Sequence, residues 1–345
     1  MRSKKRVAVV GGGVVGLTCA YRISDDHSVC VIGERIGPES DSWKATAVWH
    51  VYLVPETEEV LSWAQRSLGM FYELAQDSSK TGVELVQGVE LFRRGSPQVP
   101  TWSHIPRLFE MLTPEQVATY NPAVVDGLPS DDMAMLARHP VRWGYRIEAP
   151  AARMDRYLSW LEESVRNKHV EVSRQRLAAL SELESEFDLI INCSGFGARE
   201  LVPDRDCVPY KGQYFVLKRA DGSPSVYIGD DDHPGGMAYM IPRFDEVMVG
   251  GCAEQGKEDL QLTLDWTDTI RRAGLFVPWL RDRSQSDQSR PPVVGIRPCR
   301  TKGVRLESDY SLARIPVIHN YGHGGSGFSL SWGCAEAVQA LIRAI

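Results

Sequence analysis

The sequence predicts an α/β protein in which a domain with a parallel sheet is interleaved with a second domain built on an antiparallel sheet. Three observations predict this class. A glycine-rich turn between a buried strand and a helix opens the chain, a run of short strands joined by tight turns occupies its second half, and another strand followed by a glycine-rich turn and a helix closes it. Because segments of the first kind lie on both sides of the second, the chain must cross between two domains several times.

The opening segment has the pattern of a strand, a turn, a helix and a second strand. Arg6–Val10 is a short β-branched run suited to a buried parallel strand, and Leu17–Ile23 has helical character. Ser28–Ile32 is a second β-branched run. The unit occupies about thirty residues, which is the length of a nucleotide-binding βαβ half.

The turn in this unit has the spacing Gly-x-Gly-x-x-Gly. Gly11 makes the bend, Gly13 lets the backbone approach a pyrophosphate, and Gly16 lets the helix lie close to the sheet. The amides at the helix N-terminus form an anion site. Glu34 follows the second strand, where its carboxylate can accept hydrogen bonds from both ribose hydroxyls and disfavours a 2′-phosphate. The pattern therefore predicts a site for NAD or FAD rather than NADP.

The middle of the chain does not continue a simple βαβ series. Helices are predicted over 57–74 and 154–165, and strands over 83–92, 169–172 and 187–192. The last of these strands runs into Cys193-Ser194-Gly195, where small residues allow a cofactor to come close.

The second half of the chain is richer in strands. Residues 213–217, 237–241 and 246–249 are predicted strands, and the last two are joined by a turn, which indicates antiparallel pairing. A final strand near Val317 leads into a glycine-rich segment and a helix over 330–345, so a second helix N-terminus is available to the cofactor.

The composition bounds the function. The chain has 345 residues, of which 39 are Lys or Arg and 45 are Asp or Glu, and no dense basic cluster predicts nucleic acid or an anionic membrane as partner. Residues 1–20 imitate a secretory signal, but the glycines of the turn are unsuited to a membrane helix. Seven cysteines without a CxxC pair favour reduced thiols and a cytoplasmic enzyme. No metal site is predicted, and a homodimer is one assembly that the sequence leaves open.

Four motifs in chain order resemble the FAD-dependent D-amino-acid oxidase and D-aspartate oxidase family. They are Val9-Val10-Gly11-Gly12-Gly13-Val14-Val15-Gly16-Leu17, Ala238-Tyr239-Met240-Ile241-Pro242, Gly295-Ile296-Arg297-Pro298, and His319-Asn320-Tyr321-Gly322-His323-Gly324-Gly325. The resemblance implies a glutathione-reductase-like FAD-binding domain (1–55, 134–196 and 286–345) interleaved with an antiparallel-sheet substrate domain (56–133 and 197–285). It also implies oxidation of a D-amino acid to the imino acid, with hydride transfer to flavin N5 and reoxidation by O2 to give H2O2.

The resemblance also assigns roles to residues. Arg297 supplies a planar fork that can bind the substrate carboxylate through two hydrogen bonds, Tyr239 offers a hydroxyl to the same group, and the carbonyl of Gly325 accepts from the substrate amine. His50 and Tyr52 are expected in the substrate pocket. From residue type alone, Arg297 could equally form a surface ion pair and Tyr239 could be a core residue.

The expected cofactor contacts lie at both ends of the FAD. The ribose is expected on Glu34, the pyrophosphate at the first helix, and the isoalloxazine near Trp49 and Gly325. The complete set of expected contacts is Gly11, Gly13, Val14, Val15, Gly16, Glu34, Arg35, Ser42, Thr46, Ala47, Val48, Trp49, Leu177, Ser194, Gly195, Gly324, Gly327, Phe328 and Ser329.

The chain departs from the family pattern at several positions. Gly235 stands where a lid tyrosine is expected, which predicts a shorter lid and room for bulky groups, and Asp41 is an acid near the pyrophosphate. Ala253 stands where the aspartate-specific branch has an arginine, so a neutral side chain is favoured over D-aspartate. Three alternatives stay open: a dehydrogenase with another electron acceptor, a biosynthetic amine oxidase, and a flavin-fold protein without catalysis.

Overall fold

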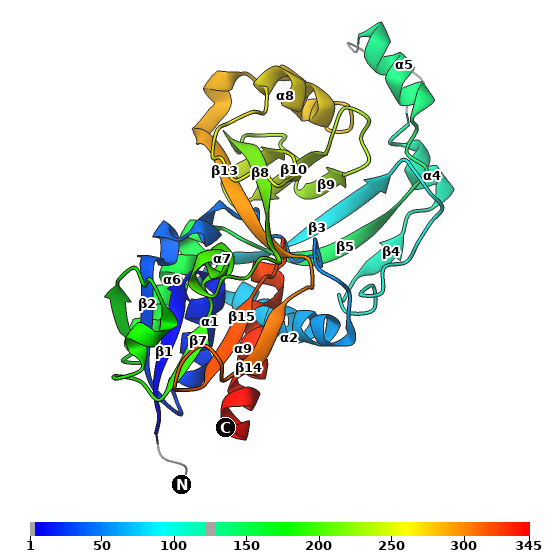
Figure 1. The fold of residues 1–345 in the computed structure, drawn as a ribbon. Coiled ribbons are helices and arrows are strands. Elements are labelled where there is room, and N and C mark those ends of the chain that lie inside the picture. Colours follow the sequence, from blue (N-terminus) through cyan, green and yellow to red (C-terminus); the bar gives the residue numbers. More distant parts are fainter. Residues whose placement is uncertain (1–3, 122–128) are drawn as a thin grey trace.

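The computed structural model describes residues 4–121 and 129–345. It contains two sheets and nine α-helices within these residues (Figure 1). The helices are α1 (Val14–Ile23), α2 (Glu58–Leu74), α3 (Ser78–Thr81), α4 (Pro114–Ala118), α5 (Ser130–Arg138), α6 (Met154–Asn167), α7 (Ala198–Leu201), α8 (Trp266–Gly274) and α9 (Gly327–Ala344).

The first sheet has six strands. They are β1 (Arg6–Gly12), β2 (Ser28–Ile36), β6 (Glu171–Arg174), β7 (Leu189–Asn192), β14 (Arg305–Asp309) and β15 (Val317–Tyr321). Their order is β14-β15-β7-β1-β2-β6, and every neighbouring pair is parallel except β14 with β15. β7 and β15 are buried throughout and β1 is buried from Val7 to Val10, in agreement with the predicted β-branched runs.

The second sheet has nine strands. They are β3 (Val83–Phe92), β4 (Phe109–Met111), β5 (Trp143–Ala152), β8 (Cys207–Lys218), β9 (Val226–Asp230), β10 (Ala238–Arg243), β11 (Glu246–Gly250), β12 (Glu254–Gln255) and β13 (Gln288–Arg300). Their order is β12-β8-β11-β10-β9-β3-β5-β4, and β13 pairs with β8. All pairs are antiparallel except β3 with β9. The predicted α/β class with two different sheets is therefore confirmed.

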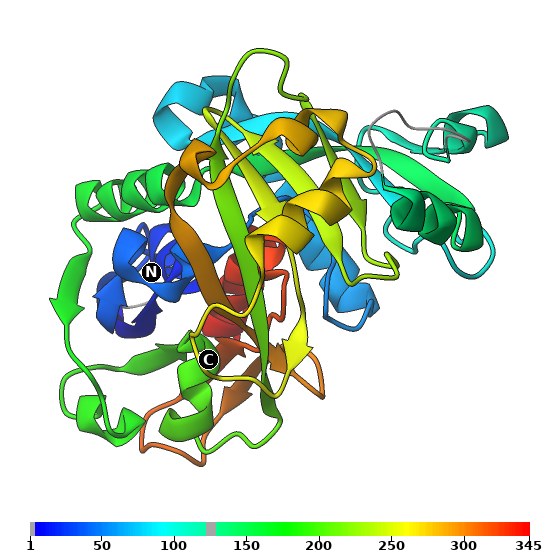
Figure 2. The same ribbon diagram turned by 90° about the horizontal axis from the view of Figure 1, so that it is seen from above.

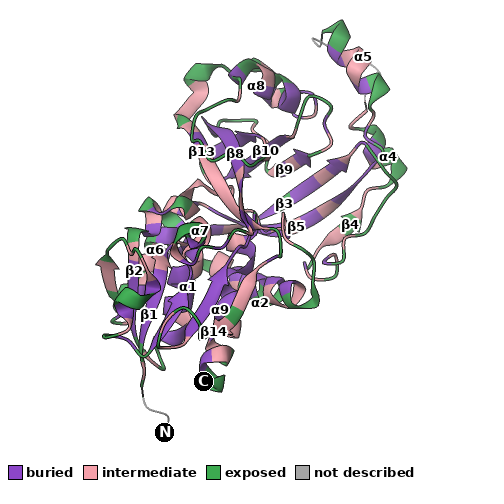
Figure 3. Cartoon of the chain, in the orientation of Figure 1, coloured by how far each residue is buried: buried purple, intermediate pink, exposed green. Residues whose placement is uncertain are grey.

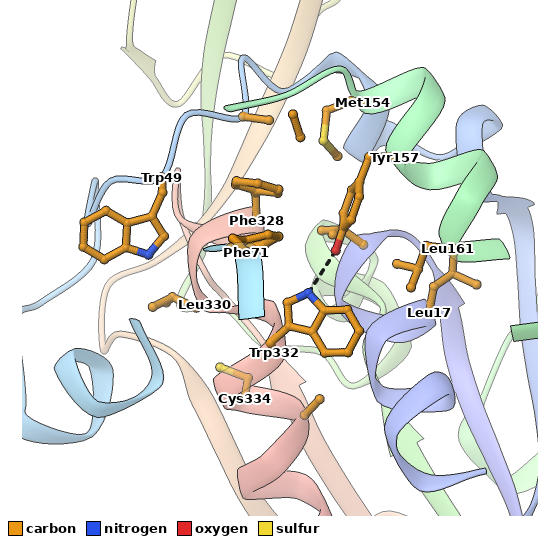
Figure 4. Close-up of a cluster of buried hydrophobic side chains, with 14 of the residues drawn as sticks. Leu17, Trp49, Phe71, Met154, Tyr157, Leu161, Phe328, Leu330, Trp332 and Cys334 are labelled. Atoms are coloured by element: carbon orange, nitrogen blue, oxygen red, sulfur yellow. Dashed lines mark hydrogen bonds between the residues drawn. The ribbon is translucent and has the colours of Figure 1, made fainter. Parts of the chain in front are cut away.

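Helices α2, α6 and α9 share an aromatic core beside the first sheet (Figure 4). The rings of Phe71 on α2 and Phe328 on α9 stack at 4.0 Å between centroids, and Trp332 Nε1 donates to the hydroxyl of Tyr157 on α6 at 3.0 Å. Thr57 caps α2 by accepting from the amide of Val60. The core fixes the start of α9, which lies at the end of β15.

The two faces of the second sheet pack against different parts of the protein. One face packs against α8, with Phe215, Met240 and Val249 against Trp266 and Ile270. Figure 2 shows α8, in yellow, lying across these strands. The residues of the other face, among them Tyr214, Tyr239 and Ile241, belong to the same buried cluster as the first sheet. Buried residues concentrate in both sheets (Figure 3).

Two strands of the second sheet come from segments that were expected in the first domain. Residues 143–152 and 288–300 fall in segments assigned to the first domain, yet they form β5, which pairs with β3 over ten positions, and β13, which pairs with β8. The reason is that their partners are distant in sequence, so local pattern does not reveal the pairing. The chain returns to the first sheet only after β5 and again after β13. Likewise β2 extends to Ile36, so Glu34 lies within the strand rather than after it.

Among the described residues, none of the helices has the length and apolar character needed to cross a bilayer.

Candidate active site

A cavity of about 900 Å³ lies at the carboxyl ends of the parallel strands and is bounded on its other side by β8 and β13. Its volume falls in the range of cofactor and ligand pockets. It is lined by eighteen of the predicted residues: Gly11, Gly13, Val14, Val15, Glu34, Arg35, Ser42, Thr46, Ala47, Val48, Leu177, Ser194, Gly195, Arg297, Gly324, Gly325, Gly327 and Phe328. The tertiary structure thus brings together segments from both ends of the chain.

The glycine-rich turn needs glycine for close packing. Gly11 has φ +116°, and a Cβ there would lie 2.3 Å from the carbonyl oxygen of Cys193. A Cβ at Gly16 would lie 1.9 Å from the carbonyl oxygen of Gly11. Gly16 does not line the cavity itself, so its role is the close contact between α1 and the turn.

Two helix N-termini open toward the cavity. α1 begins after Gly13 and α9 after Ser326, and neither residue caps its helix with a side-chain hydrogen bond. Neither helix has an acid in its first turn. The amide of Val14 donates to Ser42 Oγ at 3.0 Å, and the following amides of α1 are left for an anion.

The other lining groups also suit a dinucleotide. Ser194 Oγ is buried without a hydrogen-bond partner among the described residues, and a Cβ on Gly195 would meet nothing within 4 Å. The acid at position 41 is neutralised, since Asp41 contacts Arg35 Nη2 at 2.7 Å and Lys44 Nζ at 3.0 Å. The sequence does not predict that Lys44 lines the cavity. An orphaned hydroxyl, open backbone and neutralised acid together fit a pyrophosphate-containing cofactor.

Two predicted cofactor contacts, Trp49 and Ser329, lie outside the lining of the cavity. The indole of Trp49 is fully buried in the core, donates to the carbonyl of Ala64 at 3.2 Å and does not line the cavity (Figure 4). Ser329 is also outside the lining, and its hydroxyl accepts from the amide of His50 at 2.9 Å. These contacts hold the segment that follows Val48 against α2 through Trp49 and against α9 through Ser329.

The predicted carboxylate clamp occupies the inner face of the second sheet. Arg297 on β13 reaches over Gly212 of β8, where a Cβ would lie 2.5 Å from its Nη1. The same Nη1 donates to the carbonyl of Cys252 at 3.0 Å, and the guanidinium lines the cavity. Tyr239 is 8% exposed and its hydroxyl has no hydrogen-bond partner among the described residues. Burial raises the pKa of Tyr239, and the nearby Arg297 opposes this shift.

Gly325 and the two predicted pocket residues lie beside this clamp. The amide of Gly325 donates to the carbonyl of Tyr52 at 3.1 Å, and the Tyr52 ring lies 5.8 Å from the Arg297 guanidinium carbon. His50 Nε2 lies 3.0 Å from the hydroxyl of Tyr145, and burial lowers the pKa of His50 to about 4. At neutral pH the His50 ring is therefore uncharged. Tyr239, His50 and Tyr52 are not among the residues that line the 900 Å³ cavity.

The segment between β9 and β10 is a tight turn at Gly235. The amide of Gly235 donates to Nδ1 of His233 at 3.1 Å, and Arg272 Nη1 donates to the carbonyl of Met237 at 2.7 Å. Arg272 of α8 therefore holds this connection in place.

Stability should fall as the pH falls from about 6.5 to 4, because His323 is buried at the turn before α9. Its pKa is lowered by burial to about 4, so the unfolded chain takes up a proton that the folded protein does not. The shift corresponds to about 3 kcal/mol of unfolding free energy lost over this range. Chemical denaturation of the wild type and His323→Gln at pH 7 and pH 4.5 measures it. The variant should lose less on acidification, whereas His104→Gln, at an exposed position, should match the wild type; equal losses in all three would contradict the assignment.

Comparison with known proteins agrees with this geometry. Residues 6–341 match the family model described as FAD dependent oxidoreductase. The chain is 35% identical over 341 residues to a D-amino-acid oxidase of Rubrobacter xylanophilus, covering 98% of this chain and 96% of that protein. It is 28% identical to the human D-aspartate oxidase, covering 98% and 94%. The fold is similar to glycine oxidase from Geobacillus kaustophilus, with a TM-score of 0.75, 16% identity and coverage of 99% and 95%. The chain therefore belongs to the FAD-dependent oxidoreductase family, and its cofactor is FAD.

Proposed function

We propose that this protein oxidises a D-amino acid to the corresponding imino acid, with O2 as the electron acceptor. The observation that carries the proposal is the clamp. The Arg297 fork and the unpartnered hydroxyl of Tyr239 stand on one sheet face beside the Gly325 loop, at the end of a cavity that fits FAD. Relatives named D-amino-acid oxidase over nearly the whole chain support the D configuration.

The residues of this chain contribute mainly by position. Arg297 binds the substrate carboxylate through two parallel hydrogen bonds, and Tyr239 donates its hydroxyl to the same group. The high pKa of Tyr239 keeps that hydroxyl protonated. The carbonyl of Gly325 accepts from the neutral amine. With these three contacts fixed, only one enantiomer directs its Cα hydrogen toward the cofactor while its side chain enters the remaining space.

The reaction balances without a protein acid or base. The Cα–H bond breaks with loss of a hydride and the amine loses a proton, which leaves the imino acid. FAD, when bound, supplies the acceptor for that hydride. The two electrons and two protons finally convert O2 into H2O2. His50 is uncharged and hydrogen-bonded to Tyr145, so its contribution is to pocket shape.

The state of the cysteines bears on the cellular compartment of the enzyme. All seven cysteines are free, and six of them are buried, which supports a reducing compartment such as the cytoplasm. A small-molecule amino acid is the partner. Light scattering on the purified protein would determine whether a homodimer forms.

Peroxide release tests the proposed function. Purified FAD-loaded protein would be assayed in air with the D and L forms of alanine, phenylalanine, lysine and aspartate. We expect peroxide from D forms alone, and a poor rate with D-aspartate because Ala253 offers no cation to a second carboxylate. Flavin reduction by D forms without peroxide would favour a dehydrogenase. Oxidation of L forms would overturn the proposal.

A further inference from the structure

One face of the nine-stranded sheet carries both the clamp and an acid that the proposed reaction does not use. In the strand register, Tyr239 of β10 and Glu90 of β3 both lie opposite Gly229 of β9. Side chains at directly opposed positions share a face. With neighbouring strands about 4.8 Å apart, the Cα atoms of Tyr239 and Glu90 are roughly 10 Å apart. Glu90 therefore stands two strands away from the clamp.

Gly229 lies between Tyr239 and Glu90, and because it has no side chain, the space between these two residues stays open. A Cβ built on Gly229 would lie 2.4 Å from Glu90 Oε2 and 3.1 Å from Oε1. The carboxyl of Glu90 thus leans across β9, in the direction of Tyr239. A larger residue at position 229 would fill the place where this carboxyl lies.

Glu90 has no cationic partner among the described residues. No lysine, arginine or histidine forms a hydrogen bond or ion pair with it, and the groups that act on its pKa are Asp231, Tyr227 and Asp230. Burial raises the pKa of Glu90, the acids Asp231 and Asp230 raise it further, and the hydroxyl of Tyr227 opposes the shift. The contrast with Asp230 is direct, because Asp230 is paired with Arg93 Nε at 2.7 Å. A half-buried acid without a cation is costly unless something else neutralises it.

A second, unpartnered polar group stands at the same place. The hydroxyl of Tyr227 lies close enough to Glu90 to lower the pKa of that carboxyl, and it makes no hydrogen bond of good geometry among the described residues, although Tyr227 is 3% exposed. Tyr227 lies opposite Gly88, the next residue on the face of Glu90. Asp231, two residues after Gly229, is exposed at the rim. One half-buried acid, one buried hydroxyl and one exposed acid therefore face the side-chain end of the clamp.

We propose that Glu90 determines substrate specificity by binding the cationic side chain of a basic D-amino acid, such as D-lysine, D-ornithine or D-arginine. The inference rests on the proposed oxidation of D-amino acids. A substrate held by Arg297 and Tyr239 extends its side chain over Gly229, and its ammonium or guanidinium group reaches the Glu90 carboxylate. Asp231 attracts the cation at the entrance. The absence of an arginine at Ala253, which disfavours D-aspartate, is equally required here, since a cation at that end would repel a basic side chain.

The test compares D-lysine with D-norleucine, a neutral analogue of similar length. The rate constant for flavin reduction would be measured anaerobically against substrate concentration, which removes any dependence on the electron acceptor. We expect the wild type to favour D-lysine. Glu90→Gln should lower the D-lysine to D-norleucine ratio roughly 30-fold or more, because a desolvated charge pair is lost. Asp232→Asn, a control in the same acidic run, should leave the ratio unchanged.

Each outcome has a separate meaning. Preference for D-lysine that Glu90→Gln abolishes, with unchanged flavin content and melting temperature, supports the inference. Wild-type preference for D-norleucine overturns it while the proposed function stands, and this comparison needs no variant. An unchanged ratio in Glu90→Gln also overturns the role of Glu90. If no D-amino acid reduces the flavin, the proposed function fails and the inference fails with it.

Discussion

Replacing Arg297 with alanine is expected to lower kcat/KM for D-amino acids on the order of 100- to 1,000-fold. The guanidinium is the cation that lines the cavity beside the unpartnered Tyr239 hydroxyl, so its loss leaves a desolvated substrate carboxylate without its bidentate partner. Among the described residues, the side chain forms hydrogen bonds only with the backbone carbonyls of Lys211 and Cys252, and we therefore expect the fold and the flavin spectrum to survive. Steady-state kinetics with matched flavin content measure the effect.

Two further variants define the cause. Arg297→Lys should also be poor, because a point charge does not reproduce the planar fork. Arg314→Ala removes an arginine whose side chain is 92% exposed and should leave kcat/KM unchanged. An Arg297→Ala enzyme that works nearly as well as the parent would show that another group holds the carboxylate.

Replacing Gly13 with valine is expected to abolish FAD binding. A Cβ at this position would lie 2.7 Å from Ser42 Oγ, the atom that accepts from the first amide of α1. The remaining methyl groups would occupy the cavity at the helix N-terminus, where the pyrophosphate is proposed to lie. The purified variant should be colourless, and added FAD should not restore the visible absorption.

The matched control is Gly69→Val on the exposed side of α2. A Cβ at Gly69 would meet nothing within 4 Å, and the residue is remote from the cavity lining. This variant should retain a stoichiometric amount of FAD with some loss of stability from the helix propensity of valine. Stoichiometric FAD in Gly13→Val would contradict the proposed position of the pyrophosphate.

The parts of the site that local sequence encodes were predictable. The spacing of Gly11, Gly13 and Gly16 fixes a strand, a turn and a helix within a short stretch, and the structure has that unit with the predicted cavity at its end. The resemblance extended this to Arg297, which no local pattern would separate from a surface arginine.

The parts that depend on tertiary packing were not predictable. Trp49 was expected at the cofactor, but the direction of its side chain is set by packing against Trp102, which is distant in sequence. β5 and β13 were expected in the first domain, and only their pairing with β3 and β8 identifies the sheet to which they belong. Glu90 was missed for the same reason, since only sheet register places it across Gly229 from Tyr239. The prediction of a substrate with a neutral side chain rested on Ala253 and therefore did not take Glu90 into account.

The most direct test of the account is an anaerobic titration of the purified flavoprotein with single amino-acid enantiomers, followed by visible absorption. The account predicts a yellow protein whose flavin absorption is bleached stoichiometrically by D-lysine and, less efficiently, by other D-amino acids, and is left unchanged by L-lysine. A protein that takes up no FAD, or one whose flavin is bleached by the L-enantiomer and not by the D-enantiomer, would contradict it.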